Sequence, residues 1–253
     1  MKNLKVAGLS YDIQWKDKAK NYSTIEREFQ DIIADVFLLP EMFATGFCMD
    51  ADEIADRHNE TLAWMQNFAQ KKQAAVAGSV SVASEGKFYN RFYFVLPNGD
   101  YEYYDKRHLF SYSGEEKIYS PGTERKIVKY KGFRILLQIC YDLRFPVFSR
   151  NNNDYDIAFY VANWPESRVD TWNHLLKARA IENQAYVMGI NRIGKDGNRL
   201  IYVESSHCFF ADGQLTSEIN GAVISATLNL DKLLEFRSKF QFLNDRDTFE
   251  MRL

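Results

Sequence analysis

Short runs of apolar, β-branched and aromatic residues recur from one end of the chain to the other. Polar or turn-forming residues bound each run, which is the pattern of β-strands. The runs predict strands at residues 4–9, 34–39, 74–82, 88–96, 101–105, 133–140, 156–162, 186–193, 200–203 and 222–228. The dipeptide Asn98-Gly99 lies between two of these runs and predicts a tight hairpin turn.

Three other segments place apolar residues at helical spacing. They predict helices at residues 21–33, 59–71 and 170–184. In the third helix, Leu175, Ala178 and Ile181 form the predicted buried face. Helices alternate with strands in the first half of the chain, and strands dominate between residues 74 and 140. This mixture favours an α/β fold with mixed sheets and helices on the outside.

The composition indicates one globular domain spanning residues 1–253. The chain is 46% hydrophobic and has only 5 prolines, and no Pro/Gly/Ser-rich linker or internal repeat divides it. Its 32 basic and 34 acidic residues give a net charge of 32 − 34 = −2, which argues against a general nucleic-acid binder. No apolar run approaches the roughly 18 residues of a membrane span, so we expect no membrane partner.

The cysteines indicate a reducing compartment. Cys48, Cys140 and Cys208 are an odd number and lie far apart, so a disulfide scaffold is not expected. The N-terminus has no signal-peptide pattern. We therefore expect a cytoplasmic protein. The four histidines show no HExxH or CxxC-type spacing, and no GxGxxG or P-loop occurs, so the sequence predicts no metal and no cofactor.

Three residues could carry chemistry. Glu41 follows a buried strand and a proline, Lys106 ends an aromatic strand, and Cys140 lies where an apolar strand runs into a polar turn. Taken singly, each also fits an ordinary structural role: Glu41 as a solvated acid, Lys106 as a solvated lysine and Cys140 as a small buried hydrophobic residue. Together they form an acyl-transfer apparatus. The carboxylate can act as general base, the thiol as nucleophile, and the lysine can stabilise an oxyanion.

At these residues the sequence resembles the nitrilase superfamily, the carbon–nitrogen hydrolases. The three signatures read Leu39-Pro40-Glu41-Met42-Phe43, Tyr104-Asp105-Lys106-Arg107-His108-Leu109-Phe110 and Ile139-Cys140-Tyr141-Asp142-Leu143-Arg144-Phe145-Pro146. Their key residues are 106 − 41 = 65 and 140 − 106 = 34 positions apart. Similar segments at 162–165, 177–184 and 191–194 extend the likeness over nearly the whole chain.

The resemblance implies a four-layer α-β-β-α sandwich and assigns roles to the three residues. Cys140 would be the nucleophile that forms a thioester, and Glu41 the general base. Lys106 would stabilise the tetrahedral intermediate together with the backbone N–H of Tyr141. A second glutamate is also implied in the loop after the lysine. Glu115 is the best match, with Glu116 next to it as the alternative.

Within the superfamily, the segment Phe43 to Met49 and the tail from Arg237 are similar to the omega-amidase branch. That branch hydrolyses the ω-amide of 2-oxoglutaramate and 2-oxosuccinamate. Such a substrate carries a carboxylate, for which Arg144 is the candidate partner, with an ion pair to Asp142 as its structural alternative. Phe47, Tyr141 and Trp164 are candidate pocket walls.

Other functions remain open at this stage. The same chemistry could serve an N-carbamoyl amine hydrolase, an aliphatic amide hydrolase or a nitrilase, since fold does not decide substrate. A catalytically silent scaffold is a further alternative. The segment 231–253 is apolar and aromatic, and we expect it to be buried; Phe236, Phe240, Phe242, Leu243 and Phe249 lie within it. It could pack across the interface of a homodimer, which the resemblance favours.

Overall fold

The larger of two central sheets pairs the first strand of the described chain with the last. The computed structural model describes residues 2–251. Seven strands pair in the order β13-β14-β1-β2-β3-β4-β5. Their bounds are β1 Asn3–Leu9, β2 Val36–Leu38, β3 Ala75–Ser84, β4 Lys87–Val95, β5 Tyr101–Asp105, β13 Glu218–Asn220 and β14 Val223–Asn229. The central strands β1, β2 and β3 are parallel, and the outer strands pair antiparallel.

The second sheet has five strands in the order β12-β9-β8-β7-β6. Their bounds are β6 Ile127–Tyr130, β7 Phe133–Ile139, β8 Ile157–Ala162, β9 Tyr186–Asn191 and β12 His207–Phe209. Strands β7, β8 and β9 are parallel, with antiparallel strands at both edges. Parallel strands covered on both faces read as continuous apolar runs, which is why the sequence showed them clearly.

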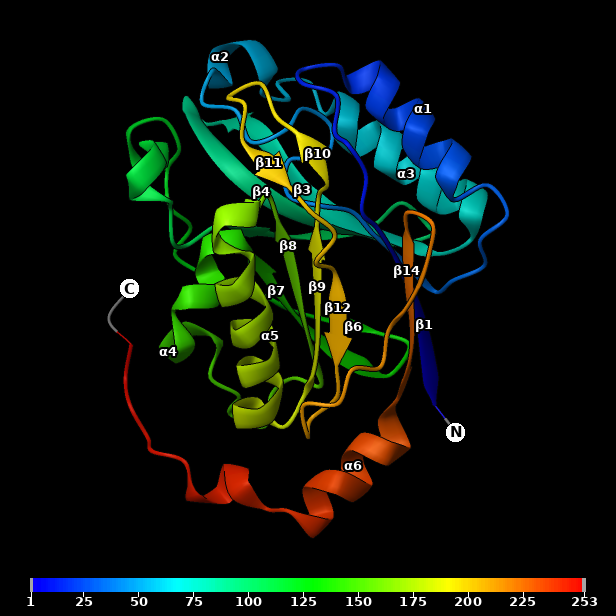
Figure 1. Ribbon diagram of the computed structural model, residues 1–253, viewed down its shortest axis with the longest axis vertical. Coiled ribbons are helices and arrows are strands. Elements are labelled where there is room, and N and C mark those ends of the chain that lie inside the picture. The colour runs from blue at the N-terminus through cyan, green and yellow to red at the C-terminus, as the bar shows by residue number, and fades with distance from the viewer. Residues whose placement is uncertain (1, 252–253) are drawn as a thin grey trace.

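Three layers of buried side chains separate four layers of structure. One cluster fills the space between the two sheets, where Val36 and Leu38 of β2 share a core with Ile135 and Leu137 of β7. Helices α1 (Lys18–Glu28) and α3 (Glu60–Lys72) cover the outer face of the larger sheet. Helix α5 (Val169–Asn183) covers the smaller one (Figure 1). The predicted α-β-β-α sandwich is therefore confirmed.

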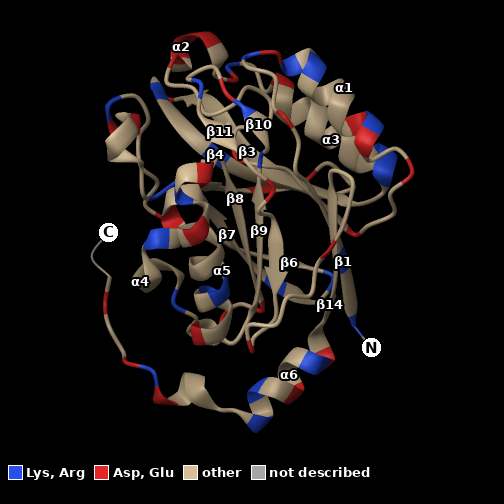
Figure 2. Ribbon diagram, in the orientation of Figure 1, with Lys and Arg blue, Asp and Glu red and all other residues tan. Residues whose placement is uncertain are grey.

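The remaining elements are short. Helices α2 (Ala51–Ile54) and α4 (Pro146–Ser149) each form about one turn, and α6 (Leu230–Lys239) follows β14. In the described part of the chain, 3-10 helices cover Ser111–Ser113, Glu115–Lys117, Cys140–Arg144, Glu166–Arg168 and Phe242–Asp245. No helix within residues 2–251 combines the length and the apolar character needed to cross a membrane. In Figure 2, charged residues gather on the outer helices and in connecting segments.

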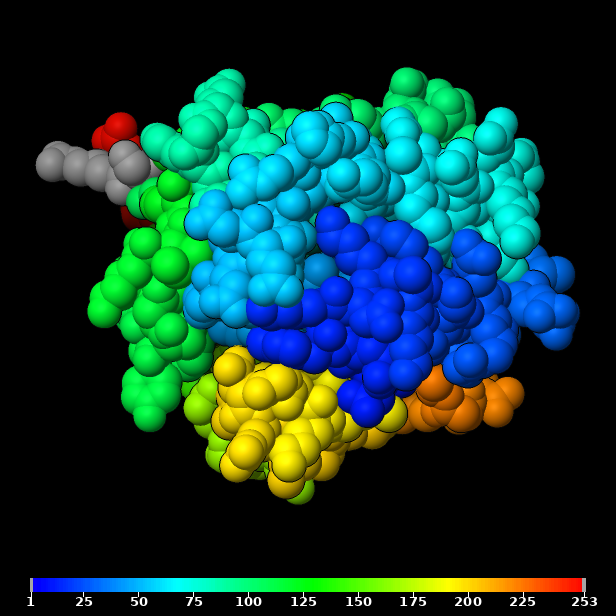
Figure 3. Space-filling model, turned by 90° about the horizontal axis from the view of Figure 1, so that it is seen from above, coloured from blue at the N-terminus to red at the C-terminus, as the bar shows by residue number. Residues whose placement is uncertain are grey.

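A small hairpin, β10 (Gly194–Lys195) with β11 (Ile201–Tyr202), packs against the N-terminal segment. A Cβ atom on Gly197 would lie 2.3 Å from the ring of Trp15, so only glycine allows this close approach. Lys16 also pairs with Asp50, at 2.7 Å between Nζ and Oδ2. Figure 3 shows the result, in which the N-terminal segment (blue), the segment after it (light blue) and the hairpin (yellow) meet on one face.

The predicted buried face of α5 is wrong. Ile181 is 46% exposed, and Leu175 and Ala178 are only partly buried. The face that packs on the sheet instead consists of Trp172, Leu176, Arg179, Ala180 and Asn183. Two of these are polar, and they are buried because they bond to backbone groups of neighbouring segments, Leu143 O and Asn151 N. Apolar periodicity cannot identify such a face.

The C-terminal segment is less buried than we expected. Leu243 is buried, but Phe242 is 61% exposed and Phe249 is 46% exposed. Phe236 and Phe240 are partly buried, and their rings pack against one another at a tilt near the end of α6. Residues 252 and 253 lie outside the described residues. In Figure 1 this segment continues from α6, passes below the lower end of α5 and then runs beside α4.

Candidate active site

Glu41 lies just beyond the carboxyl end of β2 and is fully buried. Its two oxygens accept hydrogen bonds from different strands. Oε1 accepts from the side chain of Asn90 on β4 at 2.8 Å, and Oε2 accepts from the backbone N–H of Asn163 after β8 at 2.9 Å. Asn163 also donates from its side chain to the Glu41 carbonyl at 2.6 Å. A residue within a strand of the larger sheet and a residue just after a strand of the smaller sheet therefore fix this carboxylate.

Lys106 follows β5 and is also buried, with 1% of its surface exposed. Its ammonium donates to Glu41 Oε1 at 2.9 Å and to both oxygens of Glu115 at 3.0 and 2.9 Å. Burial acts to lower the pKa of Lys106, but the charges of Glu115 and Glu41 outweigh burial and raise it above its ordinary value. Lys106 is therefore a permanent cation within this cluster.

Cys140 directly follows β7 and has a left-handed backbone conformation, with φ of +45°. Few non-glycine residues adopt this conformation, and it turns the chain sharply into a 3-10 helix. Asp142 holds the turn in place. Its carboxylate accepts from the N–H of Ile139 at 2.9 Å, from the N–H of His108 at 3.0 Å and from the hydroxyl of Tyr104 at 2.9 Å. The cysteine turn is thereby bound to the strand that carries the lysine.

The electrostatics keep the Cys140 sulfur protonated at rest. Burial raises the pKa of this thiol well above its ordinary value, the Glu41 carboxylate raises it further, and the Lys106 ammonium acts in the opposite direction. A neutral thiol is a weak nucleophile and needs a base as it attacks. Among the charged groups that act on the sulfur, the Glu41 carboxylate raises its pKa most, so Glu41 is the candidate for that base.

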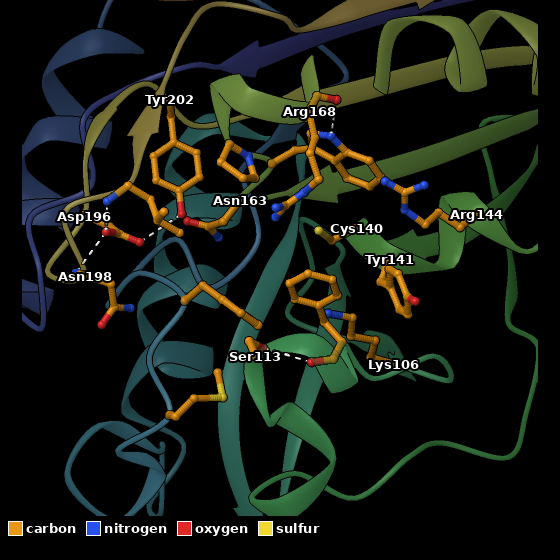
Figure 4. A pocket seen from close by; sticks show the side chains of 16 residues that line it. Lys106, Ser113, Cys140, Tyr141, Arg144, Asn163, Arg168, Asp196, Asn198 and Tyr202 are labelled. Carbon is orange, nitrogen blue, oxygen red and sulfur yellow. Dashed lines mark hydrogen bonds between the residues drawn. The ribbon is translucent and has the colours of Figure 1, made fainter. Parts of the chain in front are cut away.

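A cavity of about 320 Å³ opens above this cluster. All the residues that we proposed for substrate contact line it, namely Phe47, Tyr141, Arg144 and Trp164, together with Lys106 and Cys140. Figure 4 shows the Cys140 sulfur facing the space between them. A volume at the low end for ligand sites suits a small molecule. Within residues 2–251, no group of three or more His, Cys, Asp or Glu side chains is arranged to hold a metal ion.

Comparison with known proteins gives the family. A family model described as carbon-nitrogen hydrolase matches residues 5–237. The chain belongs to the carbon-nitrogen hydrolase family. It is 44% identical to omega-amidase YafV of Escherichia coli (strain K12), over 99% of this chain and 100% of that protein. It is 31% identical to 2-oxoglutaramate amidase of Bacillus subtilis (strain 168), over 95% and 96%.

The fold of this carbon-nitrogen hydrolase also matches a solved relative. The structure of XC1258 from Xanthomonas campestris superposes with a TM-score of 0.96 and 38% sequence identity, and each chain is covered completely. That protein is a CN-hydrolase superfamily member with an arsenic adduct in its active site. The resemblance inferred from the motifs is therefore confirmed over the whole chain, including the omega-amidase branch.

The two adjacent glutamates after the lysine are placed differently in this carbon-nitrogen hydrolase. Glu115 is fully buried, and its Oε2 accepts a further hydrogen bond from the N–H of Phe110 at 2.6 Å. Glu116 is exposed. Burial raises the pKa of Glu115, with Lys106 acting to lower it and Glu41 adding to the rise. Of the two candidates, Glu115 is the one within the cluster.

Glu115→Gln is expected to lower kcat by about 10- to 100-fold with little change in KM. The substitution removes one of the two charges that hold the Lys106 ammonium in position, and charge-assisted hydrogen bonds of this kind contribute roughly 1.5–3 kcal/mol. Steady-state kinetics measure the effect. Glu116→Gln is the matched control and should stay within about two-fold of wild type. Equal effects of both substitutions would contradict the assignment.

Sequence reasoning missed several residues of the site. Asn90 and Asn163 hold Glu41, and Asp142 holds the cysteine turn. Asp142 and Asn163 lie in segments that carry the family resemblance, whereas nothing around Asn90 in the sequence marks it. The ion pair considered between Arg144 and Asp142 is absent among the described residues. Arg144 lies over the ring of Trp164 instead, 5.0 Å from its centroid.

Proposed function

We propose that this carbon-nitrogen hydrolase is an omega-amidase. It hydrolyses the ω-amide of a short 2-oxo dicarboxylate, 2-oxoglutaramate or 2-oxosuccinamate, to the acid and ammonia. The observation that carries the proposal is the buried cluster in which Lys106 bonds to Glu41 beneath a thiol that opens on a small cavity. The names of the two curated relatives support the substrate class.

The acylation step follows from the positions of three groups. Glu41 takes the thiol proton as the sulfur of Cys140 attacks the amide carbon. The amide oxygen becomes an oxyanion, stabilised by the Lys106 ammonium and, in our proposal, by the N–H of Tyr141. Glu41 then gives its proton to the amide nitrogen, the C–N bond breaks, and ammonia leaves a thioester on Cys140.

Deacylation uses the same groups in reverse order. Glu41, again ionised, takes a proton from a water molecule, whose oxygen attacks the thioester carbon. The second oxyanion meets the same Lys106 ammonium. When it collapses, the C–S bond breaks, the sulfur recovers the proton from Glu41, and the carboxylic acid leaves. One water is consumed and one ammonia is released for each turnover, and no further group is needed for the balance.

The walls of the cavity suit a short acid. Phe47 and Trp164 supply apolar surface. The centroid of the Phe47 ring lies 5.2 Å from the Lys106 ammonium. We propose Arg144 as one cation near the substrate carboxylate. Among residues 2–251 no carboxylate lies within ion-pair distance of its guanidinium, so its charge is available to a ligand.

A substrate panel tests the proposal. Ammonia release is measured with 2-oxoglutaramate, 2-oxosuccinamate, an N-carbamoyl amine and an aliphatic nitrile. We expect kcat/KM for the better of the two 2-oxo amides to exceed that for the other two classes by at least about 100-fold, because a site built around the polar groups of one substrate rejects analogues without them. Preference for the carbamoyl amine or the nitrile would replace this function by the alternative.

Three broader expectations belong to this proposal. We propose that the chain acts as a single domain, as a homodimer, and in the cytoplasm without nucleic-acid or membrane partners. The free state of Cys48, Cys140 and Cys208 supports a reducing compartment. The large apolar side chains of Phe242 and Phe249, exposed on the C-terminal segment, support an association surface there.

A further inference from the structure

We propose that Arg168 binds the carboxylate of the substrate and makes the enzyme select amides that carry an acid over neutral amides. This inference rests on the proposed amidase function and adds a specificity residue to it. Neither the motifs nor the relatives' names single out Arg168, which lies at the end of the 3-10 helix Glu166–Arg168, directly before α5.

Among residues 2–251, only three cationic side chains line the cavity, and one of them is already neutralised. The residues that line it include Lys106, Arg144 and Arg168. Lys106 is paired with two buried carboxylates, at 2.9 Å to Glu41 and 2.9 Å to Glu115. It has no charge left for a distant anion. The cations that remain for a substrate carboxylate are therefore the two arginines.

Arg168 is held so that its guanidinium reaches the cavity. Its backbone carbonyl accepts a hydrogen bond from the indole N–H of Trp164 at 2.7 Å, which fixes the chain at this point. Its guanidinium lies over the ring of Phe110, 5.3 Å from the centroid. Figure 4 shows the side chain extending into the cavity, with its end between Asn163 and Cys140 in this view.

The guanidinium of Arg168 has a free charge. No carboxylate lies within ion-pair distance of it in the described part of the chain, although Asp196 lines the same cavity. The oxygens of Asp196 already accept hydrogen bonds from the N–H groups of Asn198 and Leu200 and from the hydroxyl of Tyr202, each at 2.9 Å. Asp196 therefore folds the β10–β11 hairpin and leaves Arg168 unpaired.

The charges of the cavity orient a substrate in one direction. At one side of the cavity, the carboxylates of Glu41 and Glu115 surround the single ammonium of Lys106. The β10–β11 hairpin adds the carboxylate of Asp196 at another side. Both sides therefore repel an anion. Arg168 and Arg144 lie on the remaining side. A molecule with an amide at one end and a carboxylate at the other will thus place the amide at Cys140 and the acid against the arginines.

Arg168 is better suited than Arg144 to select this acid. The guanidinium of Arg144 lies over the ring of Trp164, whereas in the view of Figure 4 that of Arg168 ends next to the Cys140 sulfur. A guanidinium offers paired N–H donors that match a carboxylate, and a 2-oxo acid adds a ketone oxygen beside it. A neutral amide makes neither contact, so the selectivity depends on this side chain.

The test compares Arg168→Met with Arg168→Lys, Arg144→Met and the control Arg199→Met. Arg199 is an exposed arginine on the β10–β11 hairpin that does not line the cavity. For each protein, the ratio of kcat/KM for 2-oxoglutaramate to kcat/KM for valeramide is measured. We expect Arg168→Met to reduce this ratio by about 10- to 100-fold, mostly through KM for the acid, and Arg168→Lys to reduce it less. Arg199→Met should leave it unchanged.

A second readout does not depend on turnover. The product 2-oxoglutarate should protect Cys140 from alkylation by iodoacetamide. The extent of alkylation is measured from the mass of the peptide that contains Cys140. We expect Arg168→Met to raise the half-protecting concentration by about 10- to 100-fold, and Arg199→Met to leave it as in wild type. Thermal unfolding checks that the variants keep the fold.

The outcomes separate this inference from the proposed function. In one outcome, 2-oxoglutarate protects Cys140 in wild type but not in Arg168→Met, and wild type does not hydrolyse 2-oxoglutaramate. The proposed function then fails, and the carboxylate site stands. If wild type hydrolyses 2-oxoglutaramate and Arg168→Met keeps both the ratio and the protection, the inference is overturned. If the kcat/KM ratio and the protection fall in Arg144→Met alone, the carboxylate is assigned to Arg144 instead. Absence of any protection of the wild type would also overturn it.

Discussion

Replacing Cys140 with serine is expected to reduce ammonia release by about ten-thousand-fold or more, the scale seen when a nucleophile is removed from a catalytic unit. Serine fills the same space and keeps the backbone turn, so the fold should survive. Its hydroxyl is far less acidic than a thiol, and Glu41 cannot ionise it readily. Burial already raises the pKa of the Cys140 thiol, and the same surroundings would oppose an alkoxide more strongly.

The chain supplies its own controls for this substitution. Cys48 and Cys208 are both buried and neither lines the cavity. Cys48→Ser and Cys208→Ser should therefore keep kcat close to wild type, with at most a loss of stability. Turnover is measured by ammonia release, and the fold by circular dichroism. A fully active Cys140→Ser protein, or an inactive Cys48→Ser protein with its fold intact, would contradict the assignment of the nucleophile.

Glu41→Gln is expected to lower kcat by about 100- to 10,000-fold, because a positioned general base contributes on that scale and this one acts in both half-reactions. The amide of glutamine can still accept from Lys106 and Asn90 but cannot take a proton from the sulfur. Lys106 keeps Glu115 as its partner. The cluster should therefore remain folded while its proton transfer is lost.

The same substitution should move the titration of Cys140 in a defined direction. Burial raises the pKa of this thiol most, and the Glu41 carboxylate raises it further, whereas Lys106 lowers it. Removing the Glu41 carboxylate leaves burial, the weaker effect of Glu115 and the opposing effect of Lys106, so the pKa falls and the thiolate forms at lower pH. The pH dependence of Cys140 alkylation measures this. A midpoint that stays in place or rises in Glu41→Gln would show that the two groups do not interact.

The strands that hold the site could be predicted because they are buried on both faces. In β2, Val36 and Leu38 face the core between the sheets while Phe37 faces the helices, so the run is apolar throughout. In β7, which leads into Cys140, Ile135 and Leu137 face the core between the sheets and Leu136 faces the core under α5. The three motif residues were recognised because a nucleophile, a base and a cation are distinctive residue types at strand ends.

Other parts of the site could not be predicted, because polar residues are buried by partners far away in the sequence. Asn90 reaches Glu41 across 49 positions and Asn163 across 122. On α5, Arg179 and Asn183 occupy buried positions that a hydrophobic pattern assigns to the surface. Arg168 carries no signal of its own, since an arginine before a helix usually lies in solvent. Only the fold shows that it reaches the cavity.

The most direct test of the account is the mass of the protein during turnover. Wild type is mixed with 2-oxoglutaramate, quenched in acid within the first turnovers, and examined by intact mass and by peptide mapping. The account predicts an adduct with the mass of the acyl group, located on the peptide that contains Cys140 and absent from those containing Cys48 and Cys208. Rapid ammonia release with no adduct in Cys140, or with the adduct on another residue, would contradict it.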